Sequence, residues 1–180
     1  VTTDNNGLFS VLPAIDSITG DLIYTPAQDA YAIIPITVTV SLSDDEEFGV
    51  GTDSTTVDQI FTITINQVND KPSIDDIIDV TVDEDTLSFS VDLLGITSGA
   101  FNEAQVLKVF ATSSNTSIVP NPDIDYESDN ATGELTFLPV TNASGVVNIT
   151  VSVTDDSTAG GDPSTKTINF NIYILPVNDQ

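Results

Sequence analysis

The sequence of 180 residues contains no cysteine, histidine, arginine, methionine or tryptophan. Without histidine and cysteine, the chain cannot form an ordinary Ser-His-Asp triad, a reactive thiolate or a zinc site. Without arginine, it cannot form the bidentate guanidinium clamp that holds phosphate groups. A pair of carboxylates could in principle hydrolyse a glycoside, but the acidic residues fall in turns rather than around an aromatic-lined cleft. We therefore expect that the protein is not an enzyme.

The absence of cysteine also means that no disulfide stabilises the fold. A secreted protein of this composition depends on hydrophobic cores, bound metals or neighbouring repeats for its stability. No apolar run approaches the roughly 20 residues that cross a membrane, so we expect no membrane insertion.

Basic residues are scarce. Three lysines, Lys71, Lys108 and Lys166, face 28 aspartates and glutamates, and the formal net charge is -25. Nucleic acids and anionic membrane surfaces are bound through lysine and arginine, so both are excluded as partners. Divalent cations are the natural counter-charge for such a chain.

Alternating apolar and polar residues dominate what is present. Residues 36–42 (ITVTVSL) place apolar side chains on one face and hydroxyls on the other, which is typical of a half-buried strand. The same alternation recurs at residues 61–65, 87–91, 107–109, 135–137, 147–153 and 168–174. The only weak candidate for a helix is the segment 101–109. The pattern predicts an all-β fold with cores of Val, Ile and Leu.

The sequence contains an internal repeat. Residues 68–70 (VND) recur at residues 177–179, which is 109 positions later. Residues 20–26 (GDLIYTP) resemble residues 133–139 (GELTFLP), and residues 40–45 (VSLSDD) resemble residues 151–156 (VSVTDD). A period of about 100 residues is far longer than that of a solenoid, so each period should be a domain with its own core. Because Lys71-Pro72 should form a short, stiff linker, we expect domains at residues 1–72 and 73–180.

The first domain is expected to lack its N-terminal strands. Extending the shift of 113 between residues 20 and 133 back to residue 1 leaves residues 73–113 without a counterpart. We expect that the chain is a segment of a longer array, whose neighbouring repeats are its partners. Two alternatives stay open for the exposed sheet edge: another copy covers it in a strand-swapped homodimer, or the first domain is simply incomplete.

Oxygen-bearing side chains gather where the two domains meet. Asn69 and Asp70 end the first domain, and Asp155 and Asp156 are expected in a loop at the near end of the second. Calcium binds about six to eight oxygens with loose geometry, which suits such a composite site. The pattern predicts that Ca²⁺ binds there and holds the hinge. The alternative is that these are solvated turn residues, because Asp and Asn favour loops.

Three motifs resemble a known family. Residues 68–72 (VNDKP), 82–86 (VDEDT) and 153–155 (VTD) are similar to the cadherin-like, Ig-like tandem repeats of large bacterial surface adhesins. The resemblance covers nearly the whole chain. It implies two tandem Ig/cadherin-like Greek-key β-sandwich domains, and it implies calcium bound between domains.

The resemblance also implies which residues bind the metal. Asn69 and Asp70 match the interdomain linker, and Asp155 matches the Asp that closes a late strand. Glu84 matches the first-strand Glu, which would serve the next seam beside the second copy of the linker. The candidate ligands are therefore Asn69, Asp70, Glu84, Glu103, Asp155, Asp156, Asn178 and Asp179.

The chain departs from the family pattern at several positions. Gln67 and Pro176 stand where an Asp opens the linker motif, and Asn102-Glu103 stands in place of a paired-Asp motif. Each lost carboxylate removes a calcium ligand. The expected dissociation constant for calcium is therefore that of extracellular modules, on the order of 10⁻⁴ to 10⁻³ M.

Two functions are compatible with these observations. The first is a structural and adhesion segment of a large secreted or cell-surface bacterial protein, in which calcium stiffens an extracellular spacer. The alternative is a carbohydrate-binding accessory module of a surface protein or secreted hydrolase; the partner would then be a glycan. Exposed aromatic residues distinguish the two. Most of the eight Phe and four Tyr fall on core-pattern positions, with Tyr31 and Tyr126 ambiguous.

Two further acidic runs are expected to be structural. Asp123, Asp125, Glu127 and Asp129 alternate with apolar residues, which predicts a charged edge strand that resists aggregation. A calcium clamp on that strand face is the alternative. Residues 44–47 (DDEE) are expected to form a solvated loop.

Overall fold

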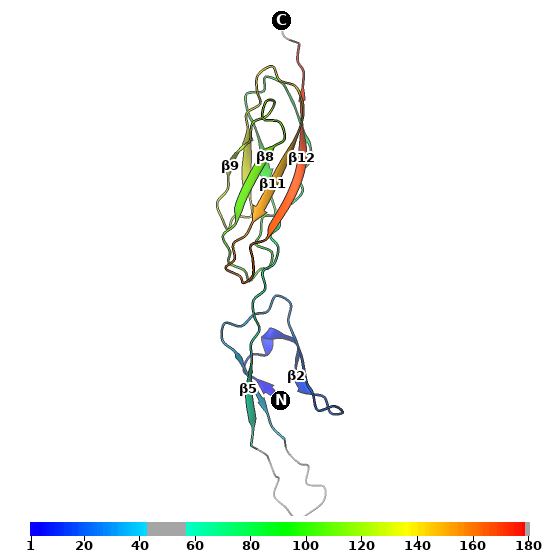
Figure 1. The fold of residues 1–180 in the computed structure, drawn as a ribbon, viewed down its shortest axis with the longest axis vertical. Coiled ribbons are helices and arrows are strands. Elements are labelled where there is room, and N and C mark those ends of the chain that lie inside the picture. The colour runs from blue at the N-terminus through cyan, green and yellow to red at the C-terminus, as the bar shows by residue number, and fades with distance from the viewer. Residues whose placement is uncertain (43–56, 179–180) are drawn as a thin grey trace, which may run out of the picture. The chain divides into compact units, whose positions relative to one another are not determined.

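The computed structural model describes residues 1–42 and 57–178, and these residues form an all-β protein of two β-sandwich units (Figure 1). Unit 1 spans Val1–Val68 and unit 2 spans Asn69–Gln180. This boundary lies four residues before the one expected at residue 72, because Asn69 and Asp70 are hydrogen-bonded to loops of unit 2. The acidic run 44–47 and Asp179 lie outside the described residues. No described helix has the length and apolarity needed to span a membrane.

Unit 2 is a Greek-key sandwich of two sheets. The first sheet has the order β6-β12-β11-β8 and the second the order β7-β10-β9. Strand β6 pairs in parallel with β12, and all other pairs are antiparallel. The strands are β6 (Val80–Asp83), β7 (Phe89–Leu93), β8 (Lys108–Ser113), β9 (Asp123–Asp125), β10 (Gly133–Phe137), β11 (Gly145–Thr154) and β12 (Thr165–Leu175). Figure 1 shows β8, β11 and β12 side by side in one layer.

The core of unit 2 follows directly from the alternation in the sequence. Every second residue of β11 from Val147 to Val153 is completely buried, and its neighbours are part-exposed. Phe137 lies at the centre, 5.3 Å from the ring of Phe89 and 6.2 Å from that of Phe170. These contacts join β10, β7 and β12, so both sheets share one apolar layer.

Asp79 attaches the start of β6 to β12. Its carboxylate accepts hydrogen bonds from the backbone N–H of Asn171 at 2.7 Å, from the amide of Asn171 at 3.3 Å and from the hydroxyl of Tyr173 at 3.4 Å. These donors, the backbone N–H of Asn171 first, lower the pKa of Asp79 because they stabilise its charged form.

Unit 1 is a smaller sandwich of the same plan. Strands β1, β4 and β5 form one sheet, and β2 and β3 form the other. The elements are β1 (Thr2–Thr3), the short helix η1 (Asn6–Leu8), β2 (Phe9–Ile15), β3 (Leu22–Pro26), β4 (Ile36–Val40) and β5 (Gln59–Ile63). Its core consists of Phe9, Ile36, Val38 and Ile63.

Equivalent backbone contacts align the two units. Thr3 pairs with Val38 as Ser113 pairs with Ile149. The N–H of residue 4 donates to Thr37 as that of residue 114 donates to Asn148. The two-residue strand β1 therefore corresponds to the last residues of β8, and the described residues of unit 1 include no counterparts of β6, β7 and most of β8. This confirms the expected loss of N-terminal strands, but the segment without a counterpart is 73–110 rather than 73–113.

Segment 101–109, the one weak candidate for a helix, contains none, because residues 101 and 102 form a turn and β8 begins at Lys108. Two other local expectations were wrong. Strand β7 begins at Phe89, and Leu87 is exposed before it. Strand β9 does lie at a sheet edge but ends at Asp125, and the chain turns at Asp129 with a φ of 75°. The four acids of residues 123–129 therefore do not share one strand face.

Removing the central aromatic ring should destabilise unit 2 strongly. We expect Phe137→Ala to lower the free energy of unfolding by about 3–5 kcal/mol, because it leaves a cavity between the sheets. Leu138→Ala, at the exposed next position, should change it by less than about 0.5 kcal/mol. Denaturant unfolding followed at core amides of unit 2 by NMR measures both. An equal decrease in the free energy of unfolding for both variants would contradict the placement of Phe137 in the core.

The pKa of Asp79 should depend on Asn171. Asn171→Ala removes the side-chain donor but keeps the backbone donor, so the Asp79 pKa should rise part of the way to its usual range. Since the folded pKa is depressed, the stabilisation from Asp79 is complete above the unfolded pKa and is lost as pH falls through the folded pKa. A carboxyl-carbon NMR titration checks this. Asn169→Ala, whose side chain contacts Thr150 instead, is the control and should leave the titration unchanged.

Candidate functional site

Three segments meet at the end of unit 2 where its chain begins. They are residues 69–73, the loop of residues 94–107 between β7 and β8, and the loop of residues 155–164 between β11 and β12. Strands β11 and β12 continue the core up to this end, so the loops are held on a rigid frame. Five of the predicted ligands, Asn69, Asp70, Glu103, Asp155 and Asp156, lie in these segments.

Asn69 connects the first segment to the β11–β12 loop. Its backbone N–H donates to the carbonyl of Gly160 at 3.1 Å. Its side-chain amide donates to Asp155 Oδ2 at 3.3 Å and to the carbonyl of Asp162 at 3.2 Å. The amide oxygen of Asn69 already accepts a hydrogen bond from Gln105 at 2.6 Å. Asn69 therefore positions the other oxygens around it.

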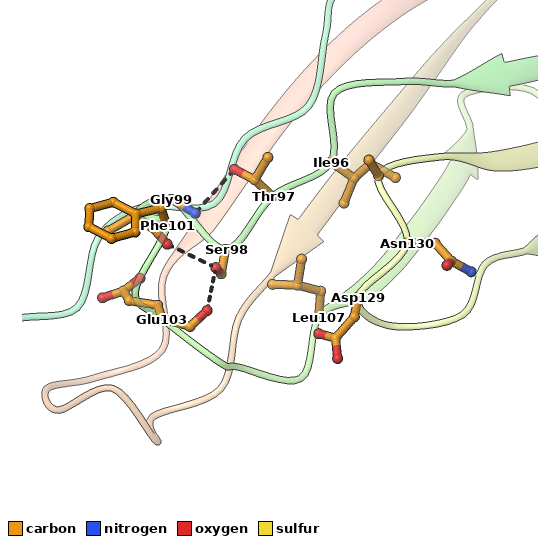
Figure 2. A pocket seen from close by; sticks show the side chains of 11 residues that line it. Ile96, Thr97, Ser98, Gly99, Phe101, Glu103, Leu107, Asp129 and Asn130 are labelled. Carbon is orange, nitrogen blue, oxygen red and sulfur yellow. Dashed lines mark hydrogen bonds between the residues drawn. The ribbon is translucent and has the colours of Figure 1, made fainter.

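Glu103 lies at the edge of a pocket of about 430 Å³ that Figure 2 shows from close by. The hydroxyl of Ser98 fixes the loop by donating to the carbonyls of Ala100 at 3.4 Å and Glu103 at 3.0 Å. Glu103 is only 8% exposed, and its Oε1 accepts the backbone N–H of Asp70 at 3.0 Å. Its Oε2 is buried and has no hydrogen-bond partner among the described residues.

The backbone of Asp70 and Lys71 lies close to that of Gly99, so Asp70 lies beside the loop of residues 94–107. Gly99 has a φ of 114°, and a Cβ at this position would lie 2.8 Å from both Asp70 Cβ and the carbonyl oxygen of Lys71. Only glycine fits such a conformation and contact. The carboxylate of Asp70 is part-exposed and makes no hydrogen bond or ion pair within the described part of the chain.

Gln105 belongs to the same site, and the sequence reasoning missed it. It is 2% exposed, and its amide nitrogen donates to Asn69 Oδ1 and to the carbonyl of Asp156, each at 2.6 Å. Its amide oxygen is buried without a partner in the described residues. One signal could have revealed it: residues 103, 105 and 107 alternate toward the interior, and two of the three are polar.

The two neighbouring aspartates of the β11–β12 loop have different roles. Asp155 is buried, and its Oδ1 accepts the backbone N–H of Ser164 at 2.6 Å. The carboxylate of Asp156 instead accepts hydrogen bonds from the backbone N–H groups of Thr158 and Val106. The hydroxyl of Thr158 is the main cause of the lowered pKa of Asp156, followed by the Thr158 backbone N–H. The structure therefore brings the carboxylate of Asp155, and not that of Asp156, to the site.

The chemistry of this cluster favours a cation. Buried acceptor oxygens normally receive a hydrogen bond, and here Glu103 Oε2 and Gln105 Oε1 receive none within the described chain. A metal ion satisfies such oxygens, whereas an anion would be repelled by the carboxylates. No three acidic side chains of the described residues group closely enough to hold an ion by themselves. Any ion here would need the amide of Gln105 and main-chain or water oxygens as well.

Two further predicted ligands, Glu84 and Asn178, lie at the opposite end of unit 2. Glu84 is buried beside the end of β12, where its Oε1 accepts the N–H of Val177 at 2.7 Å and its own N–H donates to Leu175 at 2.8 Å. Asn178 follows directly and is exposed. Because β12 runs from Thr165 to Leu175, the two ends are separated by roughly 34 Å.

The aromatic residues are less completely buried than expected. Phe101, at the rim of the pocket, is 92% exposed, and Phe110 on β8 is also exposed. The ring contacts within the described residues join Phe9 to Tyr24, and Phe137 to Phe89 and Phe170, so neither Phe101 nor Phe110 stacks on a second ring. Tyr31 and Tyr126 are half-buried, and burial, with the charge of Asp129, raises the pKa of Tyr126.

Comparisons with known proteins identify no family. No family model matches the chain, and no curated protein sequence matches it. Among solved structures, the chain is similar to domains 4 and 5 of the S-layer protein SbsC, with 18% identity, a TM-score of 0.42 and coverage of 97% of this chain and 68% of that one. For domains 1–6 of surface layer protein SbsC, the identity is 16%, the TM-score 0.42 and the coverage 98% of this chain and 20% of that one. For Drosophila N-cadherin EC1-3, the identity is 15%, the TM-score 0.35 and the coverage 98% of this chain and 54% of that one.

Proposed function

We propose that the chain is a structural segment of a secreted or cell-surface protein, in which calcium binds at the start of unit 2 and stiffens its junction with unit 1. The observation that supports this most directly is that one buried side-chain oxygen of Glu103 and one of Gln105 have no hydrogen-bond partner among the described residues. The ligands would be Glu103, Gln105, Asp155 and Asp70, with Asn69 positioning them.

Calcium fits this set better than other metals. All the available ligand atoms are oxygens, and the chain has no histidine or cysteine to favour zinc or copper. Magnesium requires nearly ideal octahedral geometry, whereas calcium accepts the irregular mixture of carboxylate, amide, main-chain and water oxygens proposed here. With few carboxylates, the dissociation constant for calcium would be on the order of 10⁻⁴ to 10⁻³ M, which suits the calcium concentration outside cells.

The proposed stiffening follows from the position of the ligands in the chain. Asn69 and Asp70 come directly after Val68, the last residue of unit 1. An ion that orders these two residues against Glu103 and Asp155 removes backbone freedom at the junction itself. Glu84, Asn178 and Asp179 would serve in the same way where another repeat follows.

Calcium should stabilise unit 2 against heat. At about 10 mM Ca²⁺ and a Kd of about 10⁻⁴ M, binding adds about 2.7 kcal/mol to the free energy of unfolding and raises Tm by several degrees. Glu103→Gln and Asp155→Asn each remove one charged ligand and should abolish most of this increase. Calorimetry with calcium and with a chelator measures the difference within each variant.

The control is Glu134→Gln, which removes an equal charge from an exposed position of β10 outside the site. It should keep the full calcium-dependent increase in Tm. An equal increase in Glu103→Gln would show that calcium acts only by general charge screening. No increase in the unmodified protein would remove the basis of the proposal.

Calcium should also narrow the range of distances between the two units. Because the chain has no cysteine, spin labels can be attached at Ile18→Cys and Leu138→Cys, both at exposed positions. Pulsed electron resonance should show a narrower distance distribution in calcium than in chelator. In a labelled variant that also carries Glu103→Gln and Asp155→Asn, the distance distribution should stay broad both in calcium and in chelator. If calcium raises Tm but leaves the width unchanged, the ion binds without stiffening the junction.

A further inference from the structure

One side of unit 1 presents open sheet edges. In the described part of the chain, β3 pairs only with β2, and β5 pairs only with β4. Their counterparts in unit 2 have a partner on each side: β10 lies between β7 and β9, and β12 lies between β6 and β11. An open strand edge is a row of backbone donors and acceptors that can receive another strand.

The core beneath these edges is partly uncovered. Tyr24 on β3 is 41% exposed, while the equivalent Phe137 on β10 is 0% exposed. Phe61 on β5 is 37% exposed, while the equivalent Phe170 on β12 is 2% exposed. The equivalence of Phe61 and Phe170 follows from the pairing, because they lie opposite Val38 and Ile149. The same positions are thus buried in one unit and exposed in the other.

Unit 2 shows which chemistry covers these positions. Phe89 of β7 stacks on Phe137, and Val91 and Leu93 continue into the same core. From β6, Val80 and Val82 pack against the edge of that core. The covering element therefore consists of two short strands with apolar residues at every second position. One strand runs antiparallel to β10 and the other parallel to β12.

We propose that unit 1 is an acceptor for a polypeptide segment with the strand pattern of residues 73–110, which adds one strand antiparallel to β3 and one parallel to β5. The backbone register places the end of this segment, because Val1 corresponds to Ala111. This acceptor surface on β3 and β5 shares no residue with the proposed calcium site.

A second copy of the chain fits this surface less well. Its own residues 73–110 are already part of unit 2, where Leu93 is completely buried. Two open faces could meet directly, but each copy carries a net charge of -25, which opposes close association.

A fusion tests the proposal. A copy of residues 73–110 is joined directly before Val1 of the full chain, in the register given above. Amide hydrogens of β3 in the fusion should exchange at least about 100-fold more slowly than in the unfused chain. The control fusion carries Phe89→Asp and Val91→Asp in the added copy only, and its β3 amides should exchange as fast as without the added segment.

Two results would overturn the proposal. The first is unchanged exchange of the β3 amides in the fusion, which would mean that unit 1 does not accept the strands. The second is a concentration-dependent dimer of the unfused chain, seen by light scattering, with the β3 amides already protected. The occupant would then be a second copy.

Discussion

Two buried carboxylates, those of Glu103 and Asp155, determine how the start of unit 2 is assembled. Burying a charge is costly unless hydrogen bonds or an opposite charge stabilise it. Glu103 accepts the backbone N–H of Asp70, which ties the first segment to the loop of residues 94–107. Asp155 accepts the backbone N–H of Ser164, which closes its own loop, and the side-chain amide of Asn69, which ties that loop to the first segment. One oxygen of Glu103 is still unsatisfied in the described structure. In a chain with only three basic residues, a metal ion is the most available source of the missing positive charge.

The rigid part of the molecule is the apolar layer between the sheets of unit 2. The long strands β11 and β12 reach both ends of this unit, so the same frame positions Asp155 at one end and Glu84 at the other. Each end has a buried carboxylate bonded to the backbone of the segment that enters or leaves the unit. In the proposed function, such an arrangement would transmit order from one repeat to the next.

The strands could be predicted from the sequence, and the loops could not. Alternation identified β4, β11 and β12 because each strand has one face in a core and one in solvent, which is a local property of the sequence. The repeat revealed the missing strands of unit 1. The course of the loop of residues 94–107 could not be predicted, because it depends on the close contact of Gly99 with Asp70 and Lys71, which are far away in the sequence.

The cluster of residues at the start of unit 2 was predicted in part for the same reason. Asn69, Asp70, Glu103 and Asp155 were expected together and lie at one end of unit 2. Gln105 was missed because its burial arises from hydrogen bonds to Asn69 and Asp156, which are far away in the sequence. Asp156 was expected beside Asp155, but the local bond to Thr158 turns its carboxylate away. Short-range hydrogen bonds thus decide which of two adjacent acids faces the site.

The most direct test is a crystal structure of the chain grown in calcium, with anomalous diffraction data to identify the ion. The account predicts an anomalous peak at the start of unit 2, with Glu103 Oε2 and Gln105 Oε1 within about 2.3–2.6 Å of it. A peak-free site, in which those two oxygens accept hydrogen bonds from water or protein donors, would contradict it.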